Sequence, residues 1–98
     1  MKLGFHLLVQ RDINEVLSYY AEGSPTAADR FWDDLHTRFR EISEQPQHFG
    51  FIQKERGLRR VRLRKFPYLI PYYQAASGIM VTCVKHERRR PAFGTTRR

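Results

Sequence analysis

The sequence predicts an α+β domain in which a helical hairpin packs on a small, mainly antiparallel sheet, in the order β-α-α-β-β-β. From residue 9 to residue 42 the apolar side chains recur with the period of a helix. After Gly57 they alternate with polar ones, as in a strand. Turn-forming residues divide each part, namely Ser24-Pro25 between the helices and Pro67 and Ala76-Ser77-Gly78 between the strands.

The apolar stretch at residues 2–8 is expected to form a first strand that leads into the two helices. Gly23 is placed to end the first helix, and Ser24 is placed to cap the second. Each helix has one apolar stripe expected to face the core; the stripes are Val9, Ile13, Val16, Leu17 and Tyr20, and then Ala28, Phe31, Trp32, Leu35, Phe39 and Ile42. Acidic side chains are expected on the solvated faces; they are Asp12, Glu15, Asp29, Asp33 and Asp34.

Residues 46–57 show no clear period and are expected to form a loop. The strand that follows, residues 58–66, directs Val61 and Leu63 to the core and Arg60, Arg62 and Arg64 to the other face. The next strand, residues 68–74, contains Pro71, which indicates a bulge or a sheet edge. Residues 79–86 are expected to form the last strand. We therefore expect a single domain over residues 1–91 and a basic tail over residues 92–98.

Composition limits the classes of protein. The 98 residues suffice for one core, and the chain has no apolar run that would span a bilayer. The N-terminal apolar stretch is too short for a signal peptide, and the single cysteine, Cys83, has no intrachain disulfide partner. These features favour a cytoplasmic protein that does not enter membranes. Whether the free protein forms a homodimer is left open.

The charge is divided between the two halves of the chain. Residues 1–56 hold seven Lys and Arg against nine Asp and Glu, a net charge of −2. Residues 57–98 hold eleven basic side chains against the single acid Glu87, a net charge of +10, and the two values sum to the total of +8. Such asymmetry is typical of a protein that meets an anionic partner, either nucleic acid or an acidic protein.

The candidate anion-binding residues lie on two neighbouring strands and just after the second of them. They are Arg60, Arg62, Arg64, Lys85, His86, Arg88, Arg89 and Arg90. Guanidinium groups bind phosphate or carboxylate with two hydrogen bonds, and their spacing along a strand is close to that of phosphates in nucleic acid. His86 is the one group among them that could transfer a proton near neutral pH; a structural role is the alternative.

The sequence has no Gly-rich phosphate loop, no Ser-His-Asp set and no histidines at metal-ligand spacing. Neither a metal site nor a cofactor is therefore expected. Cys83 shares a strand face with Ile79 and Val81, which favours a buried, structural thiol.

Several ordered stretches resemble the RelE/ParE superfamily of toxins from type II toxin–antitoxin operons. The resemblance covers about residues 5–91 and is carried by Arg11-Asp12-Ile13, Tyr19-Tyr20, residues 28–31, 58–63 and 66–70, and Val84-Lys85-His86-Glu87-Arg88-Arg89-Arg90-Pro91. The ending is more similar to the ParE, or plasmid stabilisation, branch than to the RelE branch.

The resemblance implies a small cytoplasmic toxin held inactive by a cognate antitoxin, whose acidic segment wraps it. ParE-like members inhibit DNA gyrase, and this is the function we expect. RelE-like members cleave messenger RNA on the ribosome, often with a Tyr or His near the C-terminus. In that alternative Arg62, Arg64 and Arg89 would bind the phosphate and His86 would transfer the proton, but the aromatic residue of the tail is Phe93, which has no hydroxyl group.

Overall fold

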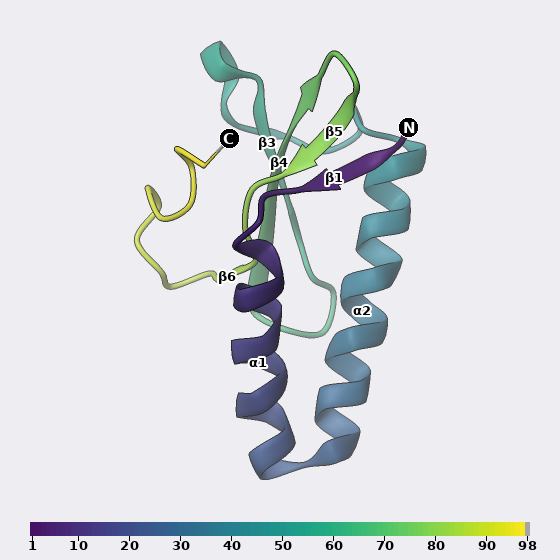
Figure 1. Ribbon diagram of the computed structural model, residues 1–98, viewed down its shortest axis with the longest axis vertical. Coiled ribbons are helices and arrows are strands. Elements are labelled where there is room, and N and C mark those ends of the chain that lie inside the picture. Colours follow the sequence, from purple (N-terminus) through teal and green to yellow (C-terminus); the bar gives the residue numbers. More distant parts are fainter. Residues whose placement is uncertain (98) are drawn as a thin grey trace.

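The computed structural model describes residues 1–97 and has the α+β architecture that the sequence predicts (Figure 1). Its elements are β1 (Leu3–Phe5), α1 (Val9–Gly23), α2 (Pro25–Glu44), β2 (Phe51–Gln53), a 3-10 turn (Lys54–Arg56), β3 (Leu58–Arg62), β4 (Tyr68–Ala75), β5 (Gly78–Val81) and β6 (Lys85–His86). The sheet order is β1-β5-β4-β3-β2, and β6 also pairs with β4. β1 is parallel to β5, and the other pairings are antiparallel.

The helical hairpin forms where the sequence predicts it. The Ser24 side chain accepts a hydrogen bond from the backbone N–H of Ala27 at 3.3 Å, and Pro25 occupies the first helical position, so α2 begins with a satisfied N-cap. The two apolar stripes meet the sheet and form one core with Ile70, Tyr72 and Val81. The prediction for Trp32 was wrong, because this side chain remains 43% exposed on the outer side of α2.

Several strand boundaries differ from the prediction, and the strand expected over residues 58–66 ends at Arg62. The first strand covers only Leu3–Phe5 rather than residues 2–8, and the predicted loop at 46–57 contains β2 and the 3-10 turn. The last predicted strand, residues 79–86, is divided into β5 and β6. Pro71 explains this division, since its carbonyl oxygen accepts from the Thr82 N–H at 3.0 Å and its ring nitrogen, which has no hydrogen, faces the same edge of β4.

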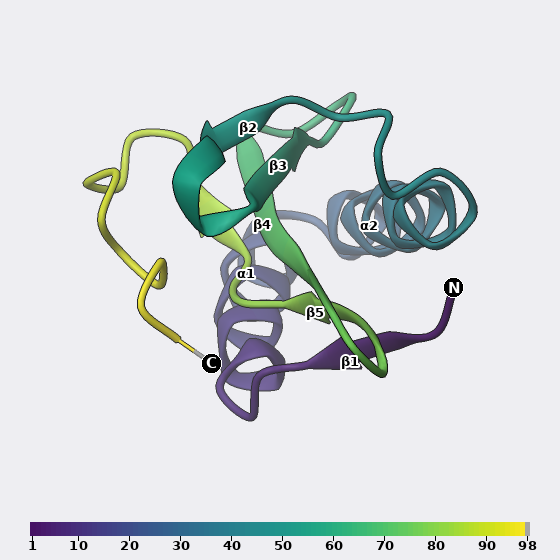
Figure 2. The same cartoon turned by 90° about the horizontal axis from the view of Figure 1, so that it is seen from above.

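The predicted basic tail is part of the folded domain over its described residues. We call residues 87–97 the C-terminal segment; it runs along the α1 side of the molecule, away from α2 (Figure 2). Arg98 lies outside the described residues. The Arg97 guanidinium group donates to Asp12 at 2.7 Å, and the side chains are 15% and 8% exposed. Thr95 is buried and its carbonyl oxygen accepts from Arg56 at 2.7 Å. The segment is therefore anchored both to α1 and to the 3-10 turn.

None of the helices in the described part of the chain is long and apolar enough to span a bilayer.

Candidate interaction surface

The sheet brings β3 and the residues after β6 together across β4. Arg62 is paired with Leu69 of β4, and Leu69 is paired in turn with Lys85 of β6. The Arg62 Nε donates to the Glu87 carboxylate at 2.9 Å, which links β3 to the start of the C-terminal segment. This hydrogen bond lowers the pKa of Glu87. Arg60, further back along β3, is exposed.

The alternation predicts that Arg64 shares the face of Arg60 and Arg62. The structure differs, because Arg64 lies beyond the strand and turns away from that face. β3 ends at Arg62, so the strand geometry does not extend to Arg64. The Arg64 guanidinium group turns to α2 and donates to Glu41 at 2.8 Å. Its backbone N–H donates to Asp34, which fixes the turn between β3 and β4 against the helix.

Lys85 was predicted to bind an anion, but the structure places it inside the domain. It is 5% exposed, and burial lowers the pKa of its ammonium group. The Nζ atom donates to the carbonyl oxygens of Pro91 at 2.8 Å and Phe93 at 3.1 Å. Lys85 therefore holds the C-terminal segment rather than presenting a charge to solvent.

Arg88, Arg89 and Arg90 form an exposed turn after β6. Within residues 1–97, no ion pair holds any of their three guanidinium groups. His86 stabilises the turn, since its Nδ1 accepts from the Arg88 N–H at 3.0 Å and its ring packs edge-on against Tyr68. We call the exposed groups of Arg60, Arg62, Arg88, Arg89 and Arg90 the basic surface.

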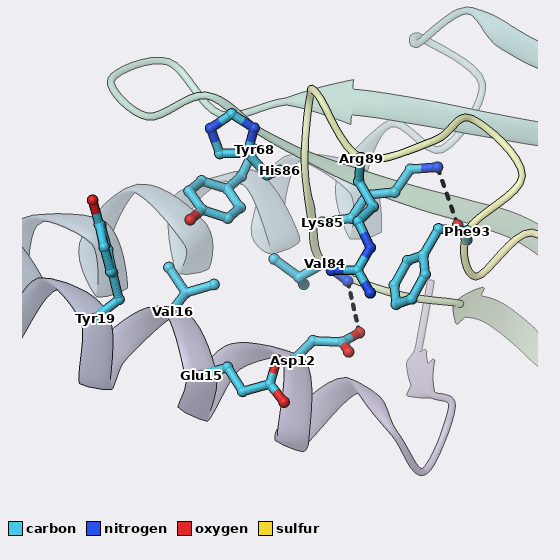
Figure 3. Close-up of a pocket in the computed structure, with 10 residues that line it drawn as sticks. All are labelled: Asp12, Glu15, Val16, Tyr19, Tyr68, Val84, Lys85, His86, Arg89 and Phe93. Atoms are coloured by element: carbon cyan, nitrogen blue, oxygen red, sulfur yellow. Dashed lines mark hydrogen bonds between the residues drawn. The ribbon is translucent and has the colours of Figure 1, made fainter.

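A cavity of about 170 Å³ opens between α1, β6 and the C-terminal segment. Figure 3 shows α1 on one side of it, with Tyr68, His86, Arg89 and Phe93 coming from the other elements. We call this cavity the α1–β6 pocket; it is lined by Asp12, Glu15, Val16, Tyr19, Tyr68, Val84, Lys85, His86, Arg89 and Phe93. Burial, with the neighbouring Tyr20, raises the pKa of Tyr68 to about 12, so its hydroxyl group stays protonated at neutral pH.

Two functional acids were missed because they were expected on solvated faces. Asp12 accepts from the buried Val84 N–H at 3.1 Å as well as from Arg97, and Asp34 accepts from the backbone N–H groups of Arg64 and Lys65. Both are 8% exposed. They hold the C-terminal segment and the β3–β4 turn, respectively, and so position the groups of the basic surface indirectly.

Within residues 1–97, no three His, Cys, Asp or Glu side chains are grouped so that they could hold a metal ion. Cys83 is buried, and burial raises the pKa of its thiol, which keeps it protonated and unreactive.

Comparison with known proteins identifies the class to which this α+β domain belongs. The family described as "ParE toxin of type II toxin-antitoxin system, parDE" matches residues 3–91. Toxin ParE2 of Mycobacterium tuberculosis, from strains CDC 1551 and H37Rv, is 30% identical over 93 residues, which cover 92% of this chain and 85% of the relative. The chain therefore belongs to the ParE toxin family and is a toxin of the type II toxin–antitoxin class.

A solved structure of the chromosomal ParDE toxin–antitoxin system from P. aeruginosa has the same fold. The two chains superpose with a TM-score of 0.75 at 17% sequence identity, and the match covers 88% of this chain and 95% of the other. At this identity the likeness concerns the fold alone.

Proposed function

We propose that this protein inhibits DNA gyrase in the cytoplasm and that a cognate antitoxin neutralises it. The observation that carries the proposal is the basic surface, where Arg88, Arg89 and Arg90 project from a turn held in place by hydrogen bonds of Lys85 and His86. Exposed guanidinium groups on a fixed turn suit the binding of an acidic protein surface. The family membership and the ParE2 relatives support the same function.

The groups that RNA cleavage would require have structural contacts here. Arg62 is bound to Glu87, Arg64 to Glu41, and the Arg89 guanidinium group lies 4.0 Å from the centroid of the Phe93 ring. His86 accepts a backbone hydrogen bond through Nδ1. The contacts of Arg62 and Arg89 do not separate the two functions, because both residues also belong to the basic surface. The engagement of the His86 Nδ1 atom in the turn favours a structural role for this imidazole, and this supports the inhibitor proposal over the nuclease alternative.

Expression in a bacterial host without antitoxin tests this assignment. We expect His86→Ala to keep at least about half of the growth inhibition, because the imidazole is assigned no proton transfer and the turn keeps the hydrogen bonds of Lys85 and the Arg62–Glu87 pair. We expect the combined replacement of Arg88, Arg89 and Arg90 by alanine to abolish inhibition, since it removes three exposed charges without touching the core. The readout is colony formation after induction, with protein level and fold checked for each variant.

A folded His86→Ala protein that no longer inhibits growth would contradict the proposal and favour RNA cleavage. Translation arrest that precedes any DNA damage response would do the same. Self-association of the free toxin is a separate expectation, to be measured by sedimentation of antitoxin-free protein.

A further inference from the structure

The α1–β6 pocket has the size and the walls of a site for one aromatic side chain. Its volume of about 170 Å³ slightly exceeds that of an apolar protein cavity known to hold benzene, about 150 Å³. Four rings line it, those of Tyr19, Tyr68, His86 and Phe93, together with the aliphatic Val16 and Val84 and the charged Asp12, Glu15, Lys85 and Arg89. An aromatic guest can pack edge-on or offset against such rings, which stabilises it beyond its buried area.

Tyr19 differs from the other aromatic residues of the lining in its high exposure to solvent. It is 68% exposed, although it lines the cavity and its ring centroid lies 5.2 Å from that of Tyr20. A large exposed aromatic side chain at the mouth of a cavity is typical of a residue that becomes covered on binding.

The charged residues at the pocket indicate which residues of a partner could flank the guest ring. Among the lining residues, Asp12 is neutralised by Arg97, and the Lys85 ammonium group is turned to two carbonyl oxygens. Glu15 is bound to Arg11 at 3.4 Å. Apart from this exposed Arg11–Glu15 pair, the charges next to the mouth are those of Arg89 and its neighbours on the basic surface, which favour acidic residues on the side of the guest that faces them.

From these observations we propose that the α1–β6 pocket anchors one aromatic side chain of an acidic segment of the antitoxin. The proposal rests on the antitoxin pairing given above and not on the inhibition of gyrase. In this arrangement the ring enters between Tyr19 and Phe93, and flanking carboxylates bind Arg88, Arg89 and Arg90. Apolar anchoring supplies most of the affinity, and the arginines supply orientation and rate.

A nucleotide is the competing guest, because a base could stack on Tyr19 while its phosphate met Arg89. Asp12 and Glu15 are both ion-paired, so the charge of the lining does not by itself separate the two guests. The toxin–antitoxin family of this chain supplies a protein partner, and this pairing favours the peptide. The oligonucleotide measurement below tests the nucleotide.

The test uses the full-length protein and a labelled synthetic peptide in which acidic residues flank a single tryptophan. Fluorescence anisotropy is measured for this peptide and for its alanine counterpart. We expect the alanine peptide to bind about tenfold more weakly, which corresponds to about 1.4 kcal/mol. We expect Tyr19→Ala to weaken binding of the tryptophan peptide about tenfold and to leave binding of the alanine peptide nearly unchanged.

Trp32→Ala is the matched control, because Trp32 is an exposed aromatic residue of α2 that lies outside the pocket lining. It should change the affinity for neither peptide. Phe93→Leu provides a second wall variant if Tyr19→Ala does not fold. Equal binding of the two peptides, or equal losses in the Tyr19 and Trp32 variants, would overturn the proposal. Tighter binding of a single-stranded oligonucleotide, weakened by Tyr19→Ala, would also overturn it and assign the pocket to nucleic acid.

Discussion

Replacement of Asp12 by alanine is expected to lower the free energy of unfolding by about 3 kcal/mol. The carboxylate accepts from Arg97 and from the Val84 N–H, and it is 8% exposed. Its removal leaves a guanidinium group that is 15% exposed without its counter-charge, and a buried N–H without its acceptor. The C-terminal segment should loosen before the rest of the domain unfolds.

Urea unfolding followed by circular dichroism measures this effect. Glu15→Ala is the matched control, since Glu15 is on the same helix and its side chain, paired with Arg11, is 68% exposed. An exposed pair of this kind contributes little, so the control should change stability by less than about 0.5 kcal/mol. Equal midpoints for the two variants would show that the Asp12–Arg97 pair does not hold the segment.

Replacement of Gly94 by alanine is expected to cost about 3 kcal/mol or to release the C-terminal segment. Gly94 has a φ of +75°, and a Cβ atom there would lie 2.5 Å from the Sγ and 2.8 Å from the Cβ of Cys83. The left-handed conformation alone costs about 1–2 kcal/mol for an alanine, and the overlap with a buried side chain adds a further penalty.

Gly57→Ala separates the two contributions. Gly57 has a similar φ of +65°, but a Cβ atom there would meet no neighbouring atom within 4 Å, so only the conformational cost of about 1–2 kcal/mol applies. Release of the segment would also expose Cys83, so the Gly94 variant should react faster with a thiol reagent. Equal stability losses in the Gly94 and Gly57 variants, with Cys83 still protected in both, would contradict the close packing of Gly94 against Cys83.

The periodicity of the sequence predicted the helices and the central strands because local patterns dictate those elements. The same periodicity also indicated that Asp12 is buried, although an acidic residue was expected on the solvated face of the helix. Asp12 is three residues after Val9 and four before Val16, within the apolar stripe. Asp34 likewise follows Phe31 by three residues. An acid inside an apolar stripe indicates a buried partner.

The rest of the site depends on contacts distant in sequence. Nothing near Arg97 indicates that it meets Asp12, eighty-five residues away. The inward turn of Lys85 likewise follows from the path of the C-terminal segment, which supplies both of its acceptors. Pro71 did indicate an irregular strand. The interruption itself lies on the neighbouring strand, between β5 and β6, and its position follows only from the register of these strands with β4.

A gyrase supercoiling reaction on relaxed plasmid, with antitoxin-free protein titrated in, is the decisive experiment for the proposed inhibition. We expect supercoiling to fall as the protein is added, and we expect the variant lacking Arg88, Arg89 and Arg90 to have no effect at the same concentrations. Full supercoiling in the presence of demonstrably folded wild-type protein would contradict the proposal.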